Sequence, residues 1–223
     1  MSRLPALLLA PIVLAQGARL RRGVPHLPPA APPAGGSRAA GALRLLVLGD
    51  STAVGTGVEQ MSDGLAGQIA RRIEEPVAWR VLGESGLRAD EVLTRHLDAA
   101  LELPADRIVL LAGWNDALQL RSATAFGRDL HAIVAALDVA NPTSRIVLVA
   151  PPRFGVFPVL PQPLRSALGA HVAGLSREAA AVARELHVSL VDGFDGVDVA
   201  ADRFHPDAAG YARLADRVVA AFG

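Results

Sequence analysis

Short, continuously apolar runs recur along the chain, and longer segments between them repeat apolar residues every three or four positions. Three of the runs do not alternate between apolar and polar residues: RLLVLG at 44–49, RIVLLAG at 107–113 and RIVLVA at 145–150. Strands of a parallel sheet that helices cover on both faces are apolar throughout, whereas half-exposed strands alternate. The pattern therefore predicts strands buried within a parallel sheet.

The apolar runs and the amphipathic segments alternate regularly after residue 43. The expected strands are 44–49, 77–82, 107–112, 145–150 and 188–192, and the expected helices are about 64–74, 89–101, 122–139, 164–186 and 206–222. This alternation is typical of right-handed crossovers in a doubly wound sheet. We predict an α/β protein with a three-layer α/β/α, flavodoxin-like fold, whose five parallel strands lie in the order 2-1-3-4-5.

The first 42 residues differ from the rest of the chain. Residues 4–15 are apolar, but the run is only about half of the roughly 20 residues that a bilayer span needs. Residues 23–41 are rich in Pro, Gly and Ala and lack apolar periodicity, which is typical of a linker. We therefore expect an apolar N-terminal segment and a Pro-rich linker over residues 1–42, followed by one folded domain over residues 43–223.

Two interpretations of the N-terminal segment remain open. The start MSR and the sequence VLA at 13–15 fit a signal peptide, and hence export. The basic run RLRR at 19–22, together with Pro5 and Pro11, favours a helix that packs on its own domain or contacts a membrane surface peripherally. We favour the second interpretation, which predicts a cytoplasmic or membrane-associated protein.

The amino-acid composition limits which partners and which kinds of active site are to be expected. Apolar residues make up 51 % and charged residues 20 %, which is typical of a folded globular protein. Lys plus Arg and Asp plus Glu both number 22, so no electrostatic interaction with nucleic acid is indicated. The sequence has no cysteine and no HxH or HxxxH spacing, so we expect neither thiolate chemistry nor a metal site. A small-molecule substrate without a cofactor is the remaining expectation, and the oligomeric state is not indicated.

Polar, glycine-bearing segments follow several of the expected strands. They are Gly49-Asp50-Ser51, Gly83 to Gly86, Gly113 to Asp116, and Ala201 to Tyr211 after the fifth strand. Ligands of such sheets bind beyond the carboxyl ends of the strands, where the strand order reverses. We therefore expect these four segments to meet at one edge of the sheet and to form the site.

Asp202 and His205 are three residues apart, and Pro206 follows the histidine. Proline favours the first helical position and excludes the residue before it from the helix. Asp202 could then accept the Nδ1 hydrogen of His205, while Nε2 takes a proton from the Ser51 hydroxyl. A helix cap explains the same spacing equally well.

A serine nucleophile also needs donors for the oxyanion that forms at the acyl carbon. The backbone N–H groups of Ser51 and Gly86 and the side-chain amide of Asn115 are the candidates. Glycine at 86 lets the backbone approach the reacting centre, and a neutral amide suits a charge that appears and disappears during turnover. The residues thus include a nucleophile, a base, its orienting acid and oxyanion donors.

Four segments, GDS at 49–51, SG at 85–86, GWND at 113–116 and DRFHP at 202–206, resemble the sequence blocks of the SGNH (GDSL-type) hydrolase family in order and spacing. The resemblance covers residues 43–223 and implies a flavodoxin-like, lipase-like serine esterase. Such an enzyme cleaves carboxylic esters through an acyl-enzyme, independently of metals. Small acyl or lysophospholipid-like esters are the implied substrates.

The same resemblance implies roles for individual residues. Ser51 would be the nucleophile, His205 the general base and acid, and Asp202 the residue that orients His205. Gly86 and Asn115 would complete the oxyanion hole with the Ser51 backbone. The chain departs from the usual pattern at residues 87–89, Leu-Arg-Ala, where a threonine normally follows the glycine, and at the large Trp114. Both departures leave the roles of Ser51, His205 and Asp202 unchanged, but they weaken any inference of this chain's substrate from other members of the family.

Other functions remain as alternatives. The same site could transfer the acyl group to a sugar hydroxyl, or it could deacetylate carbohydrates. A third alternative is a carbohydrate- or lipid-binding module that has the fold but no catalytic activity. A phosphate-binding loop is a poor fit, because Gly57 is followed by neither Lys-Ser nor Lys-Thr, and Gln60 stands where GxGxxG needs its third glycine.

A loop rich in proline follows the fourth expected strand, from Pro151 to Gly169. Its Phe154 and Phe157, together with Trp114, predict the wall of an acyl pocket, since loops at this end of the sheet build the site. The alternative is that these side chains cover the sheet edge. Asp192, Asp195 and Asp198 lack the spacing of a calcium loop, and we expect them to lie in a solvated loop.

Overall fold

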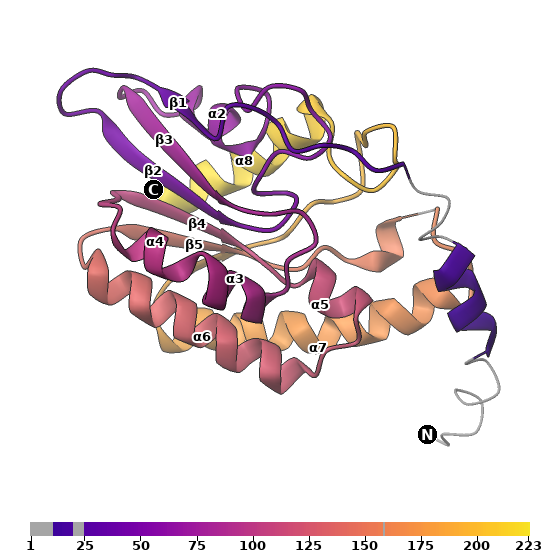
Figure 1. The fold of residues 1–223 in the computed structure, drawn as a ribbon. Coiled ribbons are helices and arrows are strands. Elements are labelled where there is room, and N and C mark those ends of the chain that lie inside the picture. The colour runs from indigo at the N-terminus through magenta and orange to yellow at the C-terminus, as the bar shows by residue number, and fades with distance from the viewer. Residues whose placement is uncertain (1–10, 20–24, 158) are drawn as a thin grey trace.

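The protein is described by a computed structural model that covers residues 11–19, 25–157 and 159–223 (Figure 1). A sheet with the strand order β1-β3-β2-β4-β5-β6 forms its centre. The five parallel strands are β2 (Leu43–Gly49), β3 (Val77–Gly83), β4 (Arg107–Leu111), β5 (Arg145–Val149) and β6 (Ser189–Val191). Counted among themselves, they have the order 2-1-3-4-5, which confirms the predicted topology.

A sixth strand, β1 (Ala34–Gly36), pairs antiparallel with β3 at the sheet edge. It comes from the segment that the sequence predicts to be a linker, so the sheet has six strands rather than five. The Trp79 ring lies directly against Gly35. A Cβ at Gly35 would be 2.5 Å from this ring, so only glycine fits at this position. The buried Ala30 donates its N–H to the Val54 carbonyl at 2.9 Å. The described part of the expected linker is thus paired with the domain, whereas the proposed domain boundary stays a prediction.

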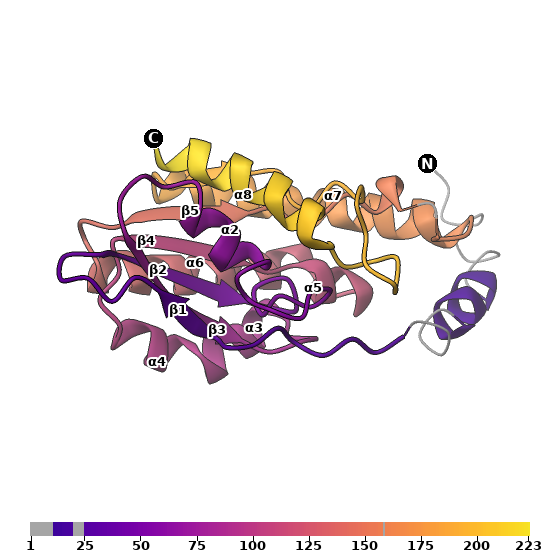
Figure 2. The same cartoon turned by 90° about the horizontal axis from the view of Figure 1, so that it is seen from above.

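Helices cover both faces of the sheet (Figures 1 and 2). One face carries α3 (Ala89–Arg95), α4 (Leu97–Leu101), α6 (Ala123–Ala140) and α7 (Leu164–Glu185), and the other carries α2 (Leu65–Ala70) and α8 (Ala208–Phe222). Two shorter helices, α5 (Trp114–Leu118) and the 3-10 turn η1 (Phe154–Val156), follow β4 and β5. The expected helix at 89–101 is divided at His96 into α3 and α4.

Successive residues of each central strand enter different cores. Along β2, Leu46 and Leu48 belong to the core beneath α6 and α7, whereas Leu45 and Val47 belong to the core beneath α2 and α8. All four side chains are buried. Burial on both faces explains why these strands are apolar at every position.

A helical segment at residues 11–19 docks against the beginning of α7. The side-chain amide of Gln16 donates to the Gln162 carbonyl at 2.7 Å and accepts the Leu164 N–H at 3.2 Å. Val13 packs against the core. The remainder of the apolar run at 4–15, residues 4–10, lies outside the described residues. Among the helices that the structure describes, none has the length and apolar character to cross a membrane.

A buried tyrosine connects α8 to the loop that follows β2. Tyr211 is fully buried, and its hydroxyl donates to the Thr56 carbonyl at 2.8 Å. Burial, with the Asp50 and Asp202 carboxylates nearby, holds the pKa of Tyr211 well above its usual value, so the hydroxyl keeps its proton. This hydrogen bond fixes the loop after Ser51 against the last helix.

Tyr211→Phe would leave the Thr56 carbonyl without this partner in the core. We expect the free energy of unfolding to fall by about 1–3 kcal/mol, measured by urea denaturation. Ser189→Ala is the control, because it removes a similar bond, to the Ala221 carbonyl at 3.0 Å, from a half-buried position. Water can replace that bond, so the expected loss is less than about 1 kcal/mol. Equal losses would contradict the assigned role of Tyr211.

Candidate active site

Ser51 lies two residues beyond β2, at the carboxyl edge of the sheet. Gly49, the last residue of β2, pairs with Gly83 of β3 and with Leu111 of β4. The three strands therefore end at one level, and their loops leave the sheet side by side. Ser51 itself is buried, with a relative exposure of 6 %.

The structure brings Ser51, His205 and Asp202 into one hydrogen-bonded chain. The distance between His205 Nε2 and Ser51 Oγ is 2.9 Å, and that between His205 Nδ1 and Asp202 Oδ2 is 2.5 Å. When Nδ1 carries the proton, it donates a hydrogen bond to Asp202, and Nε2 is free to accept a hydrogen bond from the Ser51 hydroxyl. This is the arrangement of a nucleophile, a base and an orienting acid.

Asp202 is held in place by the turn that it begins. Its Oδ1 accepts the backbone N–H groups of Phe204 and His205, each at 3.0 Å. Burial alone would raise the pKa of Asp202, but the hydrogen bond from His205 and these two backbone donors lower it below its usual value. The carboxylate therefore stays ionised beside the imidazole.

The helix cap after this turn is a different residue from the one that the sequence suggests. Helix α8 begins at Ala208, and its N-cap is Asp207, whose side chain accepts the Ala209 and Gly210 N–H groups at 2.9 and 3.0 Å. Pro206 precedes this cap instead of occupying the first helical position. The carboxylate of Asp202 therefore binds His205 and its own turn, while Asp207 caps the helix.

The expected oxyanion donors come from the loops after β3 and β4. Gly86 has a φ of +90°, and a Cβ added there would meet nothing within 4 Å, so this stretch of backbone is open on that side. Asn115 is buried in α5, and its side-chain amide donates to the Leu87 carbonyl at 2.9 Å. One N–H of Asn115 is thereby used, and the second is left for another acceptor.

Aromatic side chains cluster beside these residues. Trp114 stacks on Phe154 with ring centroids 4.4 Å apart and contacts Phe157 at 5.1 Å and Phe204 at 6.1 Å. Phe154 and Phe157 are fully buried, so they support Trp114 from behind, while Trp114 and Phe204 are half-buried. Phe204 was not singled out by the sequence analysis, although its position next to His205 is the signal that could have found it.

This chain matches the GDSL-like lipase/acylhydrolase family over residues 47–213. The chain belongs to this family. The matched range includes Ser51, Gly86, Asn115, Asp202 and His205. Membership of the GDSL-like family implies an ester-hydrolysing enzyme.

Solved structures agree with the family fold. The chain is similar to the lipase/acylhydrolase from Enterococcus faecalis (24 % identity, 80 % of this chain and 94 % of that chain, TM-score 0.63). It is also similar to the lipase Lip_vut3 from a goat rumen metagenome (20 % identity, 82 % of this chain and 99 % of that chain, TM-score 0.67). A third similar structure is a mutant of Axe2, an acetyl-xylooligosaccharide esterase from Geobacillus (17 % identity, 81 % of this chain and 94 % of that chain, TM-score 0.63). No curated protein gives a significant match.

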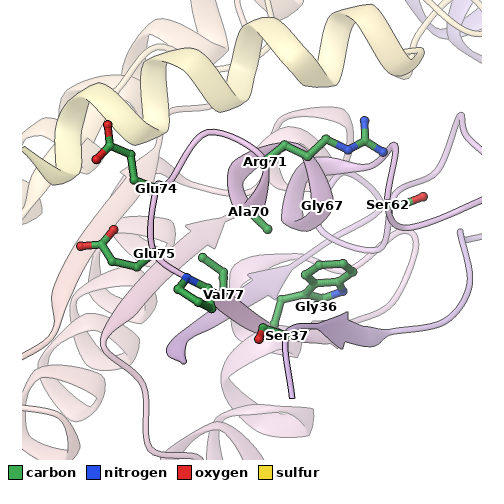
Figure 3. A pocket seen from close by; sticks show the side chains of 11 residues that line it. Gly36, Ser37, Ser62, Gly67, Ala70, Arg71, Glu74, Glu75 and Val77 are labelled. Atoms are coloured by element: carbon green, nitrogen blue, oxygen red, sulfur yellow. The ribbon is translucent and has the colours of Figure 1, made fainter. Parts of the chain in front are cut away.

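One pocket of this GDSL-like protein lies away from Ser51. It has a volume of about 320 Å³ and is lined by residues that include Ser62, Arg71, Glu75, Val77 and Trp79 (Figure 3). Val77 is the first residue of β3, whereas the loops of the candidate site follow the last residues of the strands. This pocket therefore lies at the opposite end of the sheet from Ser51.

The acidic residues of the loop before Asp202 are exposed to solvent, as expected, and are also paired with arginines. Arg213 of α8 contacts both Asp195 and Asp198, and Arg153 contacts Asp192 at 3.3 Å. Across the described part of the chain, no group of three or more His, Asp or Glu residues is placed to hold a metal ion. The pairs of Arg213 join this loop to α8, and that of Arg153 joins it to the segment after β5.

Asp50, next to Ser51, is buried, and its Oδ1 accepts the Thr52 N–H at 3.0 Å. Burial raises its pKa from 3.8 to about 6 and outweighs the opposing effects of the Thr52 N–H and the His205 charge. The nearby Asp116 carboxylate adds to the increase. The folded protein thus favours the neutral form of this side chain.

Asp50 should therefore make stability depend on pH. A raised pKa in the folded state contributes stability that is complete below the unfolded value of 3.8 and is lost as the pH rises through about 6. Asp50→Asn stays neutral, so near pH 8 it should exceed the wild type in stability by about 2–3 kcal/mol, at 1.36 kcal/mol per pKa unit. Near pH 3, below both pKa values, the two should be equal. Melting temperatures across this range measure the difference, and a difference that does not change with pH would contradict the assignment.

Proposed function

We propose that this GDSL-like protein is a serine ester hydrolase that acts through Ser51, His205 and Asp202. The observation that carries the proposal is the unbroken hydrogen-bonded chain from Ser51 Oγ through His205 to the Asp202 carboxylate. The family match supports ester hydrolysis as the reaction class. The proposed chemistry uses these three side chains, the oxyanion donors of the neighbouring loops and water.

In the first half of the reaction, His205 Nε2 removes the Ser51 proton as Oγ attacks the ester carbonyl carbon. The carbonyl oxygen becomes an oxyanion, which the Ser51 and Gly86 N–H groups and the Asn115 amide stabilise. Asp202 stabilises the imidazolium that forms at His205. The carbon–oxygen bond to the alcohol then breaks, and the alcohol leaves with the proton from Nε2.

In the second half, water attacks the acyl-enzyme. His205 accepts a proton from the water, the same donors stabilise the second oxyanion, and the bond between the acyl carbon and Ser51 Oγ breaks. The proton returns to Ser51 Oγ and the acid leaves. A sugar hydroxyl in place of this water would make the product a new ester.

Single substitutions test the proposed chemistry. Ser51→Ala and His205→Ala should each lower kcat for p-nitrophenyl acetate by about 10⁴-fold or more, because each removes a group that takes part in bond formation. Asn115→Ala should cost about 10²–10³-fold, the range for one oxyanion donor. His131→Ala, a half-buried residue of α6 that contacts Glu185 of α7, is the control and should leave kcat unchanged. Normal activity of Ser51→Ala would refute the proposal.

The aromatic cluster predicts a short acyl group. Trp114 precedes Asn115, Phe204 precedes His205, and the two rings contact each other beside the reacting groups. Phe154 and Phe157 fill the space behind Trp114. We therefore propose that the acyl side of the site accepts acetyl or similarly small groups.

Trp114→Ala should open this side of the site. We expect the ratio of kcat/KM for p-nitrophenyl octanoate to that for the acetate to rise by about 10–100-fold, as expected for added apolar contact in a pocket. Leu118→Ala, at an exposed position of the same helix α5, is the control and should leave the ratio unchanged. An unchanged ratio in Trp114→Ala would show that Trp114 does not limit acyl length.

A further inference from the structure

We propose that Asp116 is a positioning residue that holds the two loops of the oxyanion hole together. The inference rests on the proposed function. Two buried hydrogen bonds connect α5 with the segment that follows Gly86: Asn115 Nδ2 donates to the Leu87 carbonyl at 2.9 Å, and the Ala89 N–H donates to Asp116 Oδ2 at 3.0 Å. An exposed hydrogen bond from Arg88 to Gln119 lies beside them. Two consecutive residues of α5 therefore contact both sides of Arg88.

The topology makes such a connection necessary. Gly86 follows β3 and Asn115 follows β4, but β3 and β4 are not neighbours, because β2 lies between them. No strand pairing fixes one loop relative to the other. The two buried hydrogen bonds, together with the exposed bond from Arg88 to Gln119, supply this connection beside the end of β2, where Ser51 lies.

The Asp116 carboxylate also completes the beginning of α3. Ala89 is the first residue of this helix, and the first N–H groups of any helix lack intrahelical partners. Asp116 accepts this N–H from a different element, and a negative charge is favourable at a helix N-terminus. The start of α3, and with it the Gly86–Leu87 backbone, is thereby fixed to the loop that carries Asn115.

A buried ion pair holds the carboxylate in this position. The Asp116 side chain is 0 % exposed, and Arg121 Nη1 donates to its Oδ1 at 3.2 Å while Nη2 contacts Asp129. Burial raises the pKa of Asp116, and the Ala89 N–H and Arg121 oppose this change. Both oxygens are used as acceptors, one for Ala89 and one for Arg121, which an asparagine amide could not reproduce.

The consequence concerns the direction of the Asn115 amide. Its bond to the Leu87 carbonyl requires that Nδ2, and not Oδ1, faces this loop. If the loop moves, the amide loses its fixed orientation, and its second N–H no longer points reliably at the developing oxyanion. A displacement of about 1 Å can cost up to about 10²-fold in rate.

Asp116→Asn tests the proposal, with Asp129→Asn as the matched control. Both residues are buried partners of Arg121, but Asp129 has no contact with α3 among the described hydrogen bonds. We expect Asp116→Asn to lower kcat for p-nitrophenyl acetate by about 10–100-fold with KM changed less than about threefold. The affinity for a butylboronic acid, which forms a tetrahedral adduct with the serine, should fall in parallel. Asp129→Asn should lower the melting temperature comparably and leave kcat and this affinity unchanged.

Amide hydrogen exchange gives a readout that does not depend on activity. Asp116→Asn should accelerate exchange in the peptide covering residues 86–92, whereas Asp129→Asn should not. Unchanged exchange there, or equal losses of kcat in the two variants, would overturn the proposal. If Ser51→Ala kept its activity, the esterase proposal would fail, but the exchange comparison would still decide the role of Asp116.

A second variant covers the case in which Asp116→Asn fails to fold. Ala89→Pro replaces the N–H that Asp116 accepts with a ring carbon, which displaces the carboxylate, and proline is favoured at the first helical position. The preceding Arg88 has the extended conformation that a following proline requires. Ala89→Pro breaks the Ala89–Asp116 contact from the donor side, so kcat should fall as in Asp116→Asn. An unchanged kcat would overturn the proposal.

Discussion

Strand β2 is hydrogen-bonded to β3 on one side and to β4 on the other, and its side chains enter both cores. It cannot shift without breaking two ladders and two sets of buried contacts. The position of Ser51, two residues beyond its end, is fixed by these interactions. The loops after β3 and β4, which carry Gly86 and Asn115, consequently emerge on either side of this serine.

Much of this arrangement is predictable from local sequence. The continuous apolar runs identify the parallel strands because burial on both faces excludes polar residues along the whole strand. The order of the five parallel strands follows from short, right-handed connections. The spacing of Asp202 and His205 fits both a contact between them and a helix cap, and the structure shows the contact, because a single turn brings the two side chains together.

Other features depend on contacts between distant residues. Strand β1 has the sequence Ala-Gly-Gly, which carries no periodicity, and it forms because small residues fit against Trp79 of β3. Asp116 caps a helix that begins 27 residues earlier, and no local pattern reports such a pairing. Phe154 and Phe157 are apolar residues in a loop, and only the packed structure shows that they lie in the core behind Trp114.

The turn from Asp202 to His205 has a mechanical consequence. One carboxylate binds the histidine ring through one oxygen and the histidine backbone through the other, so the acid and the base form a closed ring that moves as one rigid unit. Ser51 is carried by the end of the central sheet, and the only hydrogen bond that joins it to this ring, within the described part of the chain, is the one between His205 Nε2 and Ser51 Oγ. A motion of α8 that carried the turn would therefore change the distance and the angle of this one hydrogen bond, while the bonds within the ring stayed intact.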